Sequence, residues 1–148
     1  MKSSKIALVV LFVVVHDTRN PYQIADVLGI MVAEEYLGKH IKGVIIRVDG
    51  DFYTCINSNL HQQEKRIVLA HELGHAILHR HLNYFFMLEC THYPIGRFER
   101  EANEFASELL IDDKDLWEVK EETAEYAAKV LGVTQELLTI KAQTLVKG

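Results

Sequence analysis

The spacing of hydrophobic residues predicts two long helices in the middle of the chain, at residues 59–80 and 97–111. The first is apolar nearly all round, which is typical of a helix buried at the centre of a domain. The second gathers its apolar residues on one stripe. Small residues at Gly74, Ala102 and Ala106 would let the two helices approach each other closely. We therefore expect the first helix to be central and the second to pack closely against it.

A β-hairpin is predicted before the first long helix. Residues 43–48 and 52–57 read as strands, and the pair Asp49-Gly50 between them is a strong hairpin-turn signal. Shorter helices are expected on both sides of this central region, at residues 21–28, from Asp112 onward, at 123–131 and at 134–146. No linker is long enough to separate two domains. The pattern predicts a small α+β domain, mainly helical with a short antiparallel sheet, covering residues 1–148.

The apolar run at residues 6–15 is expected to form a buried helix or strand, and its valine-rich composition favours a strand on propensity alone. It is too short for a membrane span, which needs roughly 20 residues. Lys2 and Lys5 precede it as in a signal peptide, but His16 and Asp17 follow it in place of a small-residue cleavage site. We therefore expect a cytoplasmic protein with no membrane segment.

Composition bears on two questions, whether the protein binds nucleic acid and whether it has metal chemistry. Lys+Arg is 16 and Asp+Glu is 21, which gives a formal charge of -5 and disfavours direct binding to nucleic acid. The last two helices are split at Gly132 like a helix-turn-helix, yet glutamates crowd that region. The chain also holds 8 histidines, an excess that points to metal or proton chemistry. Cys55 and Cys90 lack a paired motif and are expected to be free thiols.

The strongest chemical signal lies in the first long helix, in the string His71-Glu72-Leu73-Gly74-His75. Two histidines four residues apart share one face of a helix, so both rings can reach one zinc ion. Glu72 is rotated by about 100° around the helix axis and is badly placed as a third ligand. It is well placed to accept a proton from water activated by the metal.

A catalytic zinc needs a third protein ligand, and two candidates compete. His81 has the right spacing, but Leu78 stands where that pattern uses a glycine to leave the helix. The alternative is an acid on the later helix. Glu99 shares a face with Asn103, a possible hydrogen-bonding neighbour, whereas Glu101 is rotated about 200° from Glu99. We favour Glu99 and keep Glu101 as its competitor.

At these residues the sequence resembles the ImmA/IrrE zinc metallopeptidases. The similarity is carried by RIVLAHELGHAILH at residues 66–79 and by FEREANEFASELL at 98–110, and weaker similarity runs across most of the chain. The resemblance implies a compact gluzincin-like domain in which His71, His75 and Glu99 hold Zn²⁺ and Glu72 is the general base. It further implies a phage-type or integrative-element peptidase that cleaves one helix-turn-helix transcriptional repressor.

Two functions follow from this pattern. The first is a zinc-dependent metallo-endopeptidase, and the second is a non-catalytic module that binds a repressor and keeps the metallopeptidase fold. The intact Glu72 favours the enzyme, because a binding module does not need it. His79 lies one turn beyond the metal pair and is expected to make a structural hydrogen bond, while no metal role is assigned to His16, His40 or His61. The group that steadies the oxyanion is left open among Tyr84, His92, Tyr93 and Tyr126.

Overall fold

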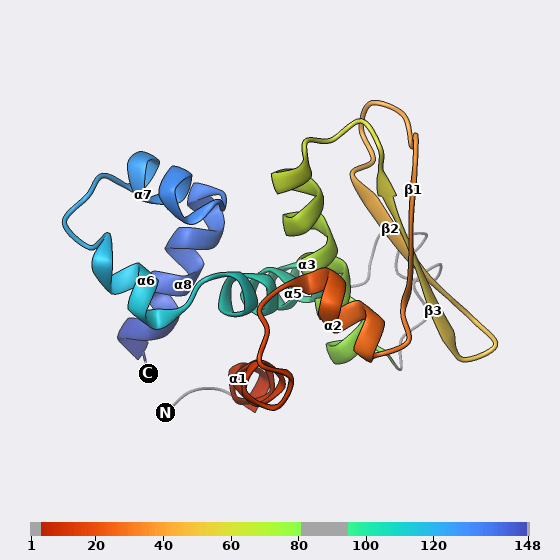
Figure 1. Cartoon of the computed structure of the whole chain (residues 1–148), viewed down its shortest axis with the longest axis horizontal. Coiled ribbons are helices and arrows are strands. Elements are labelled where there is room, and N and C mark those ends of the chain that lie inside the picture. Colours follow the sequence, from red (N-terminus) through yellow and green to blue (C-terminus); the bar gives the residue numbers. More distant parts are fainter. Residues whose placement is uncertain (1–3, 81–94, 148) are drawn as a thin grey trace.

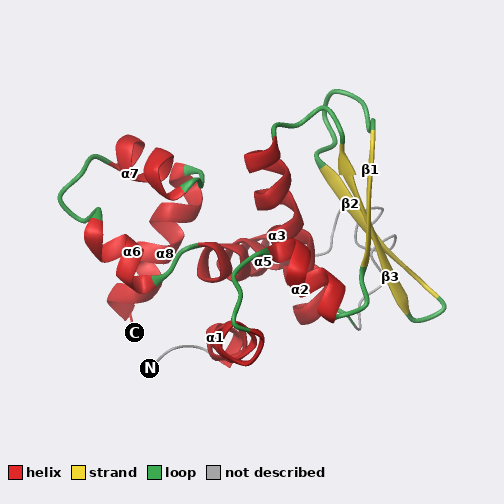
Figure 2. Ribbon diagram, in the orientation of Figure 1, coloured by secondary structure: helices red, strands yellow, loops and turns green. Residues whose placement is uncertain are grey.

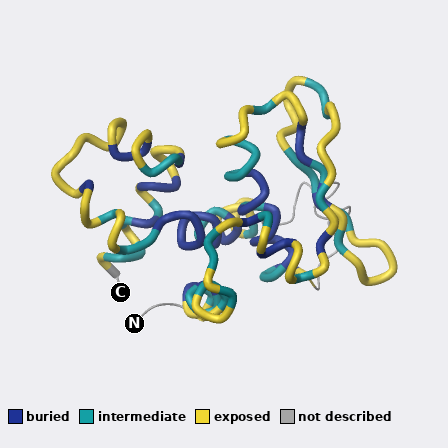
Figure 3. The backbone as a smooth tube through the Cα atoms, viewed as in Figure 1, coloured by how far each residue is buried: buried dark blue, intermediate teal, exposed yellow. Residues whose placement is uncertain are grey.

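The computed structural model describes residues 4–80 and 95–147 of the chain. Helices α3 (Gln62–Leu78) and α5 (Ile95–Leu110) cross at the centre, with a small sheet on one side and the C-terminal helices on the other (Figures 1 and 2). Figure 3 shows that burial is concentrated along these two helices. The observed fold is thus the mainly helical α+β arrangement expected from the sequence, with the helix that carries the paired histidines at its centre.

The sheet is mixed, not purely antiparallel. Strands β2 (Gly43–Val48) and β3 (Asp51–Asn57) form the predicted hairpin, and both turn residues adopt positive φ, 51° at Asp49 and 86° at Gly50. Strand β1 (Met31–Glu35) pairs in parallel with β3, giving the order β1-β3-β2 among the described residues. The sequence did not predict β1, because almost all of its residues are exposed and no apolar alternation marks it.

Of the two conformations expected for residues 6–15, the structure has the helix, since they lie in α1 (Ser4–His16); the strand that propensity alone favoured was wrong. One face of this helix packs on α5 and buries Ile6 and Val9, while Leu11, Val14 and Val15 remain exposed. Tertiary packing therefore overrides the β-propensity of the valines. Among the described residues, no helix is long and apolar enough to cross a membrane.

The remaining helices begin and end where capping residues favour it. Helix α2 (Pro21–Val27) starts after Asn20, whose side chain accepts from the backbone N–H of Tyr22. Helix α3 starts at Gln62, later than the predicted residue 59, because the backbone N–H groups of Asn59 and Leu60 both donate to Asn57 in a turn that precedes the helix. Side chains cap the starts of both α6 (Asp113–Glu118) and α7 (Ala124–Leu131), and α7 ends at Gly132, which adopts a left-handed φ of 71°.

Helix α8 (Gln135–Lys147) fastens the C-terminal helices to α5. Leu137 and Leu138 join the hydrophobic core, and the buried ammonium of Lys141 contacts carboxylates of Glu108 and Asp113. The distance from Lys141 Nζ to Glu108 Oε2 is 2.8 Å. A buried charge is tolerated only when such partners satisfy it, so this contact fixes α8 at one position against α5.

The crossing of α3 and α5 depends on small residues, as the sequence indicated. A Cβ atom added to Gly74 would lie 3.1 Å from the backbone of Ala102 and 3.1 Å from Phe105 Cβ. Both Ala102 and Ala106 are fully buried. The two helices therefore pack nearly backbone to backbone at this point, and their separation is set by the missing side chain.

Gly74→Val is expected to destabilise the fold by about 1–3 kcal/mol, because the added atoms must push apart two packed backbones. Urea unfolding followed by circular dichroism measures the change. The matched control is Gly96→Val on α5, where an added Cβ meets no described heavy atom within 4 Å. If Gly74→Val unfolded at the same urea concentration as the control, the close crossing would not limit stability.

Candidate metal centre

Three potential metal ligands converge where α3 and α5 cross. His71 and His75 come from successive turns of α3, and Glu99 comes from the second turn of α5. The Nε2 atoms of His71 and His75 are 3.2 Å apart, and each lies 2.9 Å from a carboxylate oxygen of Glu99. The two helix motifs therefore place two imidazole nitrogens and one carboxylate around a common point.

The spacing and chemistry of these atoms fit a zinc ion. Tetrahedral zinc with bonds of about 2.0–2.1 Å separates its ligand atoms by roughly 3.3 Å. The observed separations of 2.9–3.2 Å approach that value. Two histidines and one glutamate are also a known donor set of catalytic zinc, which leaves a fourth position open. Divalent metals other than zinc accept the same nitrogen and oxygen donors.

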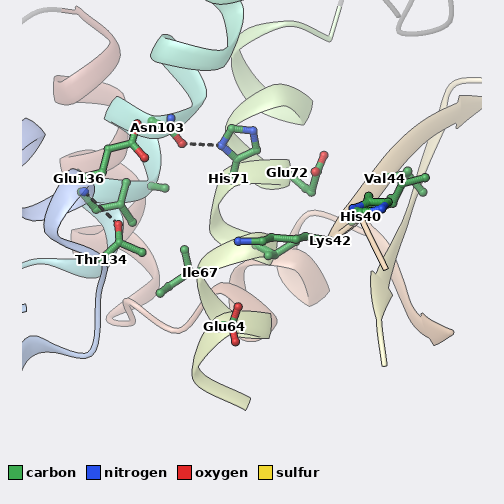
Figure 4. A pocket seen from close by; sticks show the side chains of 15 residues that line it. His40, Lys42, Val44, Glu64, Ile67, His71, Glu72, Asn103, Thr134 and Glu136 are labelled. Carbon is green, nitrogen blue, oxygen red and sulfur yellow. Dashed lines mark hydrogen bonds between the residues drawn. The ribbon is translucent and has the colours of Figure 1, made fainter. Parts of the chain in front are cut away.

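The far side of each imidazole is held by a hydrogen bond. Asn103 Oδ1 lies 2.8 Å from His71 Nδ1, and His79 Nδ1 lies 3.0 Å from His75 Nδ1. Figure 4 shows the Asn103 contact reaching from α5 to the His71 ring on α3. Asn103 thus neighbours the site, as its pairing with Glu99 suggested, but its partner is a histidine. His79 makes the structural hydrogen bond expected of it.

Glu101 lies away from this cluster. Its carboxylate contacts Lys5 Nζ at 2.6 Å, Arg97 Nε at 3.0 Å and His79 Nε2 at 3.3 Å. Burial alone would raise the pKa of Glu101, but hydrogen bonds with Lys5, Arg97 and His79 lower it to about 2. The helical rotation between Glu99 and Glu101 therefore assigns them different partners.

Glu72 is the buried carboxylate of the site, with 8% of its surface exposed. Burial raises its pKa, the charges of His71 and His75 oppose this rise, and the charge of Glu99 adds to it. A carboxylate with a raised pKa is a stronger base than an exposed one. Glu72 does not belong to the three-residue cluster, so it stands beside the ligands rather than among them.

His71 and Glu99 each shift the pKa of the other in the direction that favours its charged form. Burial by itself would lower the pKa of His71, but its hydrogen bond to Glu99 and the charges of Glu72 and Glu99 raise the pKa overall. Hydrogen bonds from His71 and His75 hold the pKa of Glu99 well below its usual range. The carboxylate is therefore ionised, which is the form that binds a cation.

A pocket of about 570 Å³ opens beside His71 and Glu72. Its lining is largely apolar and includes Ile67, Val68 and Leu137. Three charged residues also line it: Lys42, Glu64 and Glu136. Figure 4 shows His71 and Glu72 projecting from α3, with Lys42 reaching across from the side of β2 and Thr134 and Glu136 facing them. A peptide lying in this pocket would pass directly beside both residues.

One wall of the pocket is shaped by the buried amide of Asn57. Its Nδ2 donates to the carbonyls of Gly38 at 2.7 Å and Ile41 at 2.8 Å, and its Oδ1 accepts from Leu37 N. Its backbone N–H donates to the carbonyl of Lys42. These bonds fix the connection between β1 and β2, which carries the wall residues at positions 40–42.

The family model described as the IrrE N-terminal-like domain, Peptidase M78, matches residues 25–143. The chain belongs to the Peptidase M78 family. It is 40% identical over 128 residues to the uncharacterized immunity region protein 2 of Bacillus phage phi105, covering 85% of this chain and 81% of that protein. It is 37% identical over 103 residues to the metallopeptidase ImmA of Bacillus subtilis strain 168, covering 68% of this chain and 59% of ImmA. Membership supports a metallopeptidase-type function and implies a metal.

Most of the remaining candidates of this Peptidase M78 chain are residues that the structure does not describe. The alternative ligand His81 and the oxyanion candidates Tyr84, His92 and Tyr93 lie outside the described residues, as does Cys90. Tyr126 is 55% exposed on α7 and does not line the pocket. These positions keep the roles that the sequence left open, except that Tyr126 is badly placed to reach a reacting carbonyl.

Sequence reasoning missed the residues of the pocket wall. His40 was given no functional role, yet it lines the pocket, and neither Lys42 nor Asn57 was singled out. One signal was available, because asparagine is disfavoured in strands and Asn57 stands at the end of the predicted strand. Its contacts reach back 16 to 20 residues in the chain, and spacing alone does not reveal them.

Proposed function

We propose that this chain is a zinc-dependent metallo-endopeptidase in which His71, His75 and Glu99 bind Zn²⁺ and Glu72 is the general base. The observation that carries the proposal is the convergence of three ligand atoms, all within 4.8 Å of one another, beside a buried carboxylate and an open pocket. Membership of a peptidase family agrees with this chemistry.

Each group at the site has a separate role in the proposed hydrolysis. A bound zinc ion would polarise the scissile carbonyl and make water a better nucleophile. Glu72 takes the proton of the attacking water and returns it to the leaving amine, and its raised pKa suits both steps. Asn103 holds the His71 ring in the orientation that directs Nε2 toward the metal.

The substrate we propose is one helix-turn-helix transcriptional repressor. The similarity to a phage immunity region protein and to ImmA supports a regulatory protein as the target. The largely apolar lining of the pocket suits an apolar side chain of that target next to the cleaved bond. We further propose that residues 1–148 act as one domain, because α3, α5 and α8 share a single hydrophobic core. Since the proposed substrate is a transcriptional repressor, we also propose that the protein works in the cytoplasm.

The purified chain is expected to carry about one zinc and to cut a helix-turn-helix repressor into discrete fragments. Mass spectrometry identifies the fragments, and inductively coupled plasma analysis measures the metal. A chelator should stop cleavage, and added zinc should restore it, because the ligands remain in place. Cleavage that continues at full rate after complete metal removal would contradict the metal mechanism.

A further inference from the structure

We propose that His79 and Glu101 form a hydrogen-bonded chain that positions His75 for metal binding. This inference rests on the proposed metal site, but it concerns residues that do not themselves contact the metal. It assigns a role to Glu101, the acid that competed with Glu99 in the sequence. It also connects the site to α1, which lies outside the family match at residues 25–143.

The hydrogen-bonded chain from His75 through His79 to Glu101 is continuous and shielded from solvent. His75 Nδ1 lies 3.0 Å from His79 Nδ1, and His79 Nε2 lies 3.3 Å from Glu101 Oε2. The exposed fractions are 4% for His75, 2% for His79 and 8% for Glu101. Buried polar groups must be satisfied by protein partners, so these contacts cannot be exchanged for water without cost.

The chemistry of the groups gives the chain one direction. An ionised carboxylate only accepts hydrogen bonds, so His79 Nε2 must carry the proton that it shares with Glu101. In a neutral imidazole the other nitrogen then accepts, so His79 Nδ1 receives the proton of His75 Nδ1. A metal ion that replaced the proton shared by His75 Nε2 and the Glu99 carboxylate, 2.9 Å away, would then bind the Nε2 lone pair while Nδ1 keeps its proton toward His79.

Two cations hold Glu101 at the end of the chain. Lys5 Nζ lies 2.6 Å from Oε2, the oxygen that also faces His79, and Arg97 Nε lies 3.0 Å from Oε1. Arg97 is largely exposed, whereas Lys5 projects from α1, which packs on α5. Helix α1 therefore supplies, through Lys5, part of the framework that positions His75, a proposed metal ligand.

The other histidine of the proposed metal site, His71, is held by a different kind of partner, so the proposed role of Glu101 concerns His75 alone. His71 Nδ1 faces the amide oxygen of Asn103, a neutral acceptor on α5. His75 instead reaches a full negative charge through a second imidazole. His79 is the direct partner of His75, and Glu101 acts on His75 through His79. Losing an outer hydrogen-bonding partner of a metal ligand typically weakens metal binding about 10–100-fold.

The test measures the zinc dissociation constant of the full chain by competition with a chromophoric chelator. Glu101→Ala is expected to raise the Kd for zinc about 10–100-fold. Glu101→Gln keeps an oxygen that can accept from His79 and should recover part of this loss. Arg100→Ala is the matched control, because it removes an exposed charged side chain from the same helix but none of the groups in the hydrogen-bonded chain and neither cation that holds Glu101; its Kd should match the wild type.

Nitrogen-15 NMR of the histidine rings provides a readout that needs no variant and no activity. In the wild-type chain His79 is expected to carry its proton on Nε2. A proton on His79 Nδ1, or a Glu101→Ala variant that binds zinc as tightly as Arg100→Ala, would overturn the proposal. If the wild type bound no zinc at all, the proposed metal site itself would fail, and the position of the His79 proton would still decide whether the chain runs as described.

Discussion

Glu72→Gln is expected to abolish repressor cleavage while zinc stays at about one ion per chain. The amide keeps the size of the buried side chain but cannot take a proton from water, and losing a general base costs typically 10²–10⁴-fold in rate. Zinc should remain because Glu72 stands outside the cluster of His71, His75 and Glu99. Fragment formation and metal content are measured on the same preparation.

The matched control is Glu64→Gln, which changes another acid of the same helix and pocket. It should cleave close to the wild-type rate, because Glu64 has no place in the proposed chemistry. Cleavage by Glu72→Gln at the wild-type rate would remove Glu72 as the base. If the wild type formed a stable complex with intact repressor and never cut it, the non-catalytic binding module would be the better account.

Glu99→Ala is expected to lose zinc almost completely, whereas Glu101→Ala should still load when zinc is supplied in excess. Among the described residues, only Glu99 places carboxylate oxygens 2.9 Å from both Nε2 atoms, and Glu101 is engaged with Lys5, Arg97 and His79. Removing one of three protein ligands leaves two histidines, which hold zinc poorly. Metal content after desalting measures the difference.

The opposite outcome is equally clear. Zinc retained in Glu99→Ala but lost in Glu101→Ala would exchange the roles of the two acids. Circular dichroism of both variants checks that the helices are intact. Glu99 is about half exposed, so its truncation should cost little stability, and metal loss in a folded Glu99→Ala chain then reports ligation.

The elements with strong local patterns were predictable. The α5 stripe, the hairpin turn at Asp49-Gly50 and the starts of the helices near Pro21 and Ala124 each depend on residues close in sequence. The expected helix around His71 and His75 is present, although its start moved to Gln62. Boundaries moved because cap choice depends on side chains elsewhere, as the role of Asn57 toward Asn59 shows.

The elements that depend on distant partners were not predictable. Strand β1 exists because it pairs in parallel with β3, 22 residues further on at Met31 and Tyr53. Helix α1 exists because α5 offers an apolar surface for Ile6 and Val9. Spacing on two separate helices suggested Glu99, but only the close crossing at Gly74 brings it to the histidines.

The placement of the three ligands on two separate helices has a thermodynamic consequence. An ion held by His71 and His75 on one helix and Glu99 on the other would bridge them, and the unfolded chain offers no such preformed grouping. By mass action, an ion present at 100 times its dissociation constant would add about 2.7 kcal/mol to the folding free energy. The amount of native protein in a cell would then follow the supply of the ion, so scarcity would lower abundance as well as turnover.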